Sequence, residues 1–354
     1  MDQPTLSDAS NITLLLTSHI GAAVDETSDD TLGPAQWHDF RKQISNSSVE
    51  SVGELLTLDV SDWPTEVFDE TFNRSWVDQR LSNASRLALE LEELNQSGIW
   101  VTTEFEQTFP TKLTETLDRS APPFLYVAGD AANFEQDAVG FVGSRDADET
   151  DLSYTRDLVD MAIEDGYSIV SGGAKGVDAA AEEEGLTKGG PVIEFPAEGI
   201  KKCLSDEIVR TAVIEGNLTV ASMYRPDASW SVGGAMGRNK YIHGYGAYTI
   251  AVRSGDETGG TWAGATENLS DNLSTLLVCT HQDNAPGNKK LISKGANPID
   301  PESKATDDSF TSWVENEIRD ATQNGDSVSG DIEKSADDSE RNTDNENQSS
   351  LKDF

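Results

Sequence analysis

Two glycine-rich turns, a short distance apart in the chain, carry residue types that bind phosphate. The first follows the apolar run 138–142 and the second follows residues 167–170; they read Gly143-Ser144-Arg145 and Ser171-Gly172-Gly173-Ala174-Lys175-Gly176. Glycine lets a backbone approach a phosphate closely, and a helix that starts after such a turn offers unpaired N–H groups and the positive end of its dipole. Arg145 and Lys175 add positive charge. The pattern predicts a phosphate-binding site.

Two further segments are basic within a very acidic chain. Residues 216–255 contain one acid, Asp227, and four bases: Arg225, Arg238, Lys240 and Arg253. The bases at 238 and 240 belong to the run Gly237-Arg238-Asn239-Lys240, and a second basic run is Asn288-Lys289-Lys290. Positive islands in a chain of net charge −38 favour an anionic ligand over a pair of solvated helix faces.

Other residues have two interpretations at this stage. Gly259-Gly260-Thr261 is expected to open a helix that continues through Leu269, which adds another helix N-terminus that receives anions. Tyrosines at 241, 245 and 248 either stack on bases or pack half-buried. Asp178 suits the first turn of a helix better than it suits catalysis.

The common catalytic, cofactor and metal patterns are missing from the sequence. The second glycine turn matches neither the G-x-x-x-x-G-K-[ST] loop that binds nucleoside triphosphates nor the G-x-G-x-x-G motif that binds dinucleotides. The four histidines are scattered, the two cysteines lack metal spacing, and no serine or cysteine has a recognisable base partner. We therefore predict no catalytic residue, no metal and no cofactor.

Acidity extends over the whole chain of 354 residues. Acids outnumber bases by 22 to 7 in residues 1–120, by 27 to 14 in 121–300 and by 15 to 5 in 301–354. An even distribution indicates a surface adapted to a very salty cytoplasm, where carboxylates keep the protein hydrated and their repulsion is screened. No apolar run approaches the roughly 20 residues of a membrane span, and the N-terminus has no basic leader, so we expect a soluble cytoplasmic protein without membrane contact.

The apolar pattern divides the chain into three parts. Residues 1–95 have helical spacing, including a longer helical pattern over 76–94, and predict a small helical module. Residues 96–300 alternate short apolar runs with helical segments, which predicts an α/β fold with a doubly wound, mostly parallel sheet. The expected strands are 99–101, 124–127, 139–142, 169–170, 192–195, 218–221, 248–252 and 275–278. Ligands bind at the carboxyl ends of such strands, where both glycine turns fall.

The remaining part, residues 301–354, is rich in Asp, Ser, Asn, Glu and Gln. Phe310, Trp313, Val314 and Ile318 have the spacing of one short amphipathic helix. Beyond Gly325 the apolar content is too low for folding, so we expect a disordered acidic tail.

The chain resembles the DprA/Smf family of DNA-processing proteins, through a series of motifs that occur in the family's order along residues 10–300. The motifs that carry the resemblance are Gly98-Ile99-Trp100-Val101, Pro122-Pro123-Phe124, Val142-Gly143-Ser144-Arg145, the run 171–181, Gly237-Arg238-Asn239-Lys240 and the run 287–296. The family usually has a histidine where this chain has Glu182-Glu183-Glu184, and the segment 195–199 is also degenerate.

The resemblance implies an extended Rossmann-like fold that binds single-stranded DNA and helps to load a RecA-type recombinase, usually as a homodimer. It implies that Arg145, Lys175, Arg238 and Lys240 contact DNA phosphates together with the backbone amides of the glycine turns. With the residues from the motif analysis, the expected DNA-binding set is Gly143, Ser144, Arg145, Ser171, Gly172, Gly173, Lys175, Gly176, Arg238, Asn239, Lys240, Gly260, Thr261, Lys289 and Lys290.

Two alternatives stay open. Residues 258–267 loosely resemble the glycine-rich motif of phosphoribohydrolases that cleave nucleotides, in which Glu267 would be the acid–base. The third interpretation is a sensor that binds a small nucleotide without turnover.

Overall fold

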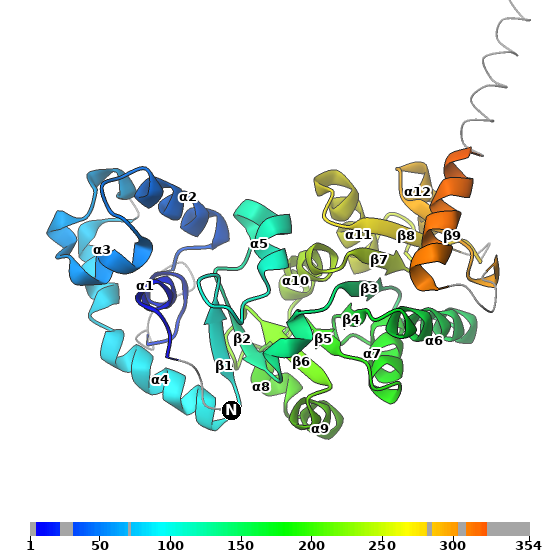
Figure 1. The fold of residues 1–354 in the computed structure, drawn as a ribbon, viewed down its shortest axis with the longest axis horizontal. Helices are drawn as coiled ribbons and strands as arrows, with labels where there is room; N and C mark the ends of the chain where they lie inside the picture. The colour runs from blue at the N-terminus through cyan, green and yellow to red at the C-terminus, as the bar shows by residue number, and fades with distance from the viewer. Residues whose placement is uncertain (1–4, 22–30, 70–71, 282–284, 304–308, 324–354) are drawn as a thin grey trace, which may run out of the picture.

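The structure is a computed structural model that describes residues 5–21, 31–69, 72–281, 285–303 and 309–323. The N-terminal module consists of helices and short 3₁₀ turns (Figure 1): α1 (Asp8–Thr17), α2 (Pro34–Ser45), η2 (Val52–Thr57), η3 (Val60–Asp62), η4 (Thr65–Val67), α3 (Arg74–Leu81) and α4 (Ala84–Gln96). The pattern over 76–94 predicts one helix, but α3 and α4 are separate helices, since the chain turns at Ser82 and Asn83.

The rest of the described chain forms a nine-stranded α/β sheet in the order β1-β2-β6-β5-β4-β3-β7-β8-β9. Its strands are β1 (Trp100–Thr103), β2 (Phe124–Ala128), β3 (Ala138–Val142), β4 (Ser168–Ser171), β5 (Val192–Glu194), β6 (Leu218–Ser222), β7 (Tyr248–Ala251), β8 (Thr275–Cys279) and β9 (Asn297–Ile299). All eight predicted strands are present. The pairs β1–β2 and β2–β6 are antiparallel, and the others are parallel.

The side of the sheet on which the chain adds strands changes at β3. From β3 the chain builds β4, β5 and β6 on one side, then returns to place β7, β8 and β9 on the other side. Because these strands are parallel, the loops after β3 and β7 leave from the same edge of the sheet and diverge there. This point is where ligands bind in open α/β sheets.

Helices cover both faces of the sheet, as Figure 1 shows. One apolar core contains side chains of α6 (Glu149–Glu164), α7 (Val177–Thr187), α8 (Ile200–Cys203) and α9 (Glu207–Glu215). The second core, on the other face, contains side chains of α5 (Thr111–Leu117), α10 (Val232–Tyr245), α11 (Gly259–Asp271) and α12 (Pro286–Ser293). Neighbouring strand residues alternate between them, so that Ile169 lies in the first and Val170 in the second.

The helical module is attached to the sheet by apolar and polar contacts. On α1, Leu14 and Leu15 join the first core of the sheet, whereas Ile12 and Leu16 join the module's own core. Glu104, which follows β1, accepts a hydrogen bond from Trp37 Nε1 at 2.6 Å. The Glu104 carboxylate also pairs with Arg41 at 2.8 Å. The module is therefore packed onto the sheet.

Residues 310–323 form a helix, drawn in orange in Figure 1, with the amphipathic spacing that the sequence predicts. Phe310, Trp313 and Val314 are buried in the first core. The Phe310 ring lies 5.6 Å from Tyr167 and 5.7 Å from Tyr248, between centroids. The predicted disorder beyond residue 325 concerns residues outside the described part of the chain. In the described part, no helix combines the length and the apolar character needed to cross a membrane.

The burial of Phe310 makes the helix of residues 310–323 part of the folded core. Replacing Phe310, which is 0% exposed, by alanine should lower the free energy of unfolding by about 3–5 kcal/mol, since the lost apolar contacts leave a cavity. Urea denaturation at constant KCl measures the change. Ile214→Ala is the control, because Ile214 is 78% exposed and its loss should change stability by less than about 0.5 kcal/mol. Equal effects of the two substitutions would contradict this packing.

Candidate nucleic-acid interface

A cavity of about 450 Å³ lies where the loops after β3 and β7 diverge. Four segments line it: the turn after β3, the turn leading into α7, α10 as far as His243 with the residue Trp230 before it, and the loop that enters α11. Of the predicted residues, the cavity lining contains Gly143, Ser144, Arg145, Arg238, Asn239, Gly260 and Thr261. Residues from three separate motifs thus meet at one place.

Three helices begin at this cavity. Residues at or beside the first turns of α7, α10 and α11 all belong to its lining, and these helices are 11, 14 and 13 residues long. The N-terminal end of a helix carries about half a positive charge and N–H groups without partners inside the helix. Three such ends around one cavity create a positive potential that does not require lysine or arginine.

The two glycine turns are in backbone contact. Gly176 has φ +85°, and a Cβ on it would overlap the Ser144 carbonyl oxygen. The N–H of Val177 donates to that same oxygen at 3.4 Å. Only glycine lets the loop into α7 pass this close to the turn after β3. The two motifs, which are separate in the sequence, therefore form one continuous surface.

Arg238 connects α10 to the second glycine turn. Its buried guanidinium donates to the Gly172 carbonyl oxygen at 2.8 Å and lies 3.5 Å from Asp178 Oδ2. A Cβ on Gly172 would overlap the guanidinium, which explains the glycine. Burial raises the pKa of Asp178, against the effect of Arg238. Within the described residues, the buried Nε of Arg238 has no hydrogen-bond partner.

An exposed apolar wall faces Arg145. The exposed guanidinium of Arg145 lies 5.3 Å above the Trp230 ring, and Trp230, Val232 and Met236 are 47%, 67% and 39% exposed. All three apolar side chains line the cavity. Motif analysis missed Trp230; the available signal was a tryptophan in the polar run Asp227-Ala228-Ser229-Trp230-Ser231. Exposed apolar side chains that gather at a cavity make this wall a candidate for ligand contact.

Three more of the predicted residues differ in their position relative to the cavity. Asn239 Nδ2 donates to the Gly260 carbonyl oxygen at 3.0 Å and so joins α10 to the start of α11. Ser171 is buried and its hydroxyl donates to the Phe141 carbonyl oxygen at 2.8 Å. Lys175 is exposed one residue after Ala174, which lines the cavity. In the described residues, neither Lys175 nor Arg145 forms an ion pair.

Lys240 lies away from the cavity. It lines a separate hollow of about 320 Å³ together with Glu267, between α10 and α11 on one side and the end of α5 on the other. Burial lowers the pKa of Lys240 and raises the pKa of Glu267. Glu267, the acid–base that the phosphoribohydrolase interpretation requires, is therefore not beside the glycine turns. Asp178 is the carboxylate that lines the cavity, and it is paired with Arg238.

The remaining basic residues are mostly neutralised. Lys290 pairs with Asp256 at 2.7 Å and Glu257 at 3.2 Å, whereas Lys289 is exposed. Arg253 pairs with Asp148 at 2.6 Å, and Arg225 lies 3.6 Å from Asp227. Tyr241 and Tyr245 are buried, so packing is the correct interpretation for these two. The basic islands of the sequence therefore give less free positive charge than their composition suggests.

Two carboxylates lie beneath the second glycine turn. Glu182, in the segment that departs from the DprA/Smf pattern, accepts a hydrogen bond from the Gly173 N–H at 2.8 Å. A Cβ on Gly173 would overlap the Glu194 carboxylate. Burial raises the pKa of both groups, for Glu194 to about 7. Among the described residues, no group of three or more His, Cys, Asp or Glu side chains is arranged to hold a metal ion.

Comparisons with known proteins place these features in context. Residues 100–309 match the family model of DNA recombination-mediator protein A. The structure is similar to DNA processing protein A from Streptococcus pneumoniae, with a TM-score of 0.64 and 18% identity over 84% of this chain and 97% of that chain. It is also similar to DNA processing protein A from Helicobacter pylori, a structure that concerns single-stranded DNA binding, with a TM-score of 0.50 and 22% identity over 63% and 96%. No curated protein sequence matches.

The buried Glu194 should make stability depend on pH. Burial raises its pKa from 4.5 to about 7, opposed by Arg238. The folded state therefore holds a proton that the unfolded state releases, and raising the pH from 5 to 8 should remove on the order of 3 kcal/mol of stability through this group. Urea denaturation at several pH values should show that Glu194→Gln weakens this pH dependence. Glu183→Gln, an exposed position on α7, should leave it unchanged. If the unfolding free energy changed with pH equally in the parent and in Glu194→Gln, the raised pKa of Glu194 would be contradicted.

Proposed function

This chain belongs to the DNA recombination-mediator protein A family, and from that premise we propose that it binds single-stranded DNA in the cavity at the loops that follow β3 and β7, without catalysing a reaction. The observation that carries the proposal is the meeting of three helix N-termini with Arg145 and Arg238 around one cavity. This set of donors suits the oxygens of a phosphodiester.

Phosphate oxygens of the strand are held by backbone amides and cations in this proposal. The N-terminal turns of α7, α10 and α11 supply N–H groups, and Arg145 and Lys175 supply charge at the rim. Asp178 is the acid in the lining, and its charge is offset by Arg238. A phosphate that enters the cavity thus meets donors and positive charge within a chain whose net charge is −38.

Bases are held by the apolar wall. Trp230, Val232 and Met236 present exposed apolar surface next to Arg145, so a base that stacks on Trp230 keeps its phosphate close to a guanidinium. Base faces are open for stacking in a single strand and covered in a duplex, which favours single-stranded DNA as the ligand. Stacking and backbone hydrogen bonds also lose less strength in salt than ion contacts do. This division of binding energy suits the salty cytoplasm that the acidic composition indicates.

We extend the proposal to the family role. The family description, a recombination mediator, supports delivery of the bound strand to a RecA-type recombinase. The homodimer that the family resemblance implies is part of the same proposal. The nucleotide-cleaving alternative loses support from the geometry, since Glu267 and the glycine turns line different cavities.

Removal of the two exposed cations should strongly weaken binding to single-stranded DNA. Arg145→Ala combined with Lys175→Ala should raise Kd by at least about 100-fold, because each cation–phosphate hydrogen bond is worth roughly 1.5–3 kcal/mol. The slope of log K against log salt should fall by about 1.4, or about 0.7 for each lost phosphate contact. Fluorescence anisotropy with a labelled oligonucleotide measures both. Arg225→Ala, an exposed arginine outside the cavity lining, is the control. Unchanged affinity in the double variant would refute the assignment.

Replacement of Trp230 should weaken binding without changing its salt dependence. Trp230→Ala should raise Kd by about 5- to 150-fold, since stacking of one base on an aromatic ring is worth roughly 1–3 kcal/mol. Trp230→Phe keeps a ring and should retain most of the affinity. Titrations at several KCl concentrations give affinity and slope together. A loss of the slope of log K against log salt in Trp230→Ala would contradict stacking. Equal affinity of the parent, Trp230→Ala and Trp230→Phe would contradict it as well.

A further inference from the structure

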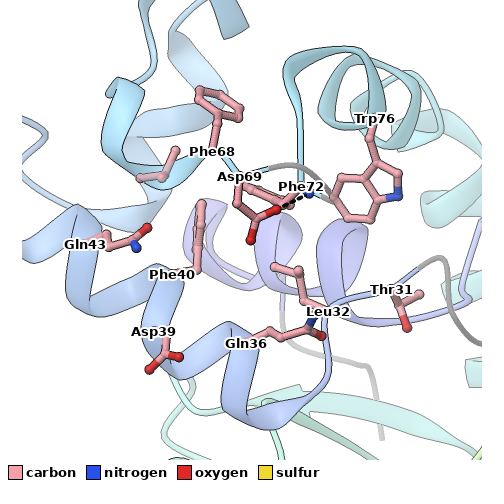
Figure 2. Close-up of a pocket in the computed structure, with 11 residues that line it drawn as sticks. Thr31, Leu32, Gln36, Asp39, Phe40, Gln43, Phe68, Asp69, Phe72 and Trp76 are labelled. Atoms are coloured by element: carbon pink, nitrogen blue, oxygen red, sulfur yellow. Dashed lines mark hydrogen bonds between the residues drawn. The ribbon is translucent and has the colours of Figure 1, made fainter.

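The N-terminal helical module contains a cavity of its own, separate from the proposed DNA site. It has a volume of about 180 Å³ and lies between α2, η4 and the start of α3. Figure 2 shows the Asp69 carboxylate turned toward α2, with Phe40 on one side of it and Trp76 on the other. The proposed DNA-binding function uses none of these residues.

Aromatic rings form one wall of this cavity. Phe72 lies at the centre of the wall, with its ring centroid 5.2 Å from Phe40, 5.8 Å from Phe68 and 5.2 Å from Trp76. Phe40 and Phe72 are buried, whereas Phe68 and Trp76 are half-buried. The face of an aromatic ring carries negative potential and attracts cations. The wall is thus suited to an organic cation rather than to an anion.

Carboxylates lie at both edges of the wall. Asp69 Oδ1 accepts a hydrogen bond from the Phe72 N–H at 2.6 Å, which orients the carboxylate beside the rings. Asp39 lines the other edge and pairs with Arg119. Residues 1–95 contain 18 acids and 5 bases, so their charge repels nucleic acid and attracts a basic partner.

The same rings already hold guanidinium groups of this chain. Arg74 Cζ lies 4.4 Å from the centroid of Phe68, and Arg80 Cζ lies 5.8 Å from that of Trp76. A planar guanidinium stacks on aromatic rings and bonds a carboxylate through two parallel N–H groups, which an ammonium does not do. The cavity offers the same two features to a guanidinium, because its aromatic rings and the Asp69 carboxylate lie next to each other.

We propose that this cavity binds an arginine side chain presented by a partner protein. The guanidinium lies against the aromatic wall and donates to Asp69, while Gln36 and Gln43, which also line the cavity, contact the partner's backbone. The site is independent of DNA binding and provides the module with a protein-recognition surface.

Binding of short blocked peptides to the full-length chain tests this proposal. The probe is glycyl-arginyl-glycine amide with an acetylated N-terminus, and the reporter is the ¹⁹F signal of Trp76 in protein labelled with 5-fluorotryptophan, assigned with Trp76→Phe. The Trp76 signal should shift saturably with this arginine peptide. It should not shift with the matched citrulline peptide, in which uncharged citrulline replaces arginine. Asp69→Asn keeps an oxygen for the Phe72 N–H and should raise Kd at least fivefold. Asp78→Asn, an exposed acid on α3, should change Kd less than twofold.

Four outcomes would overturn the proposal. Equal binding of the citrulline peptide removes the role of charge, and equal binding of a lysine peptide removes the choice of arginine. An unchanged Kd in Asp69→Asn, in protein whose other tryptophan signals match the parent, removes the role of that carboxylate. Tighter peptide binding by Arg341→Gln would identify the chain's own Arg341, which lies outside the described residues, as the occupant in place of a partner.

Discussion

The buried contact between Arg238 and the Gly172 carbonyl oxygen joins the parts on which the candidate site depends. It connects α10 with the turn after β4, and the Asp178 partner extends the contact to α7. Because a side chain on Gly172 would overlap the guanidinium, the glycine and the arginine require each other. The ends of three helices are held around one cavity as a result. Arg238 therefore positions this surface.

The location of the site follows from the topology of the sheet. The chain leaves β3 in one direction and returns for β7 on the other side, so two loops diverge from the same edge. Helix N-termini supply positive potential there from the backbone itself. This source of charge matters in a chain with 64 acids and 26 bases, where several bases of the basic segments, among them Arg253 and Lys290, are paired with acids. A backbone site keeps its character while the surface becomes acidic.

Much of the fold could be predicted because apolar runs and glycine turns are local signals. The eight predicted strands are present, but β9 was missed, since Asn297, Pro298 and Ile299 are too few and too polar to form a recognisable run. The break between α3 and α4 escaped detection because the apolar spacing continues across Ser82 and Asn83. These errors leave the sheet edge and its turns in place.

The site was harder to predict than the fold, for reasons of geometry. Arg238 and Lys240 are two residues apart on a helix and therefore point about 200° apart, so a basic run cannot place both at one cavity. The pairing of Lys290 with Asp256 and Glu257 depends on a loop 33 residues earlier in the chain. Trp230 gains its role from exposure beside Arg145, which spacing does not reveal.

The central claim is that backbone amides, stacking and two exposed cations together select a single strand. Equilibrium binding of a single-stranded oligonucleotide and its duplex across KCl concentrations up to the molar range tests it most directly. We expect the single strand to bind more tightly throughout and to keep measurable affinity in molar KCl, with the shallow slope of a few phosphate contacts. Equal affinity for both forms, or complete loss of single-strand binding at moderate salt, would contradict the account.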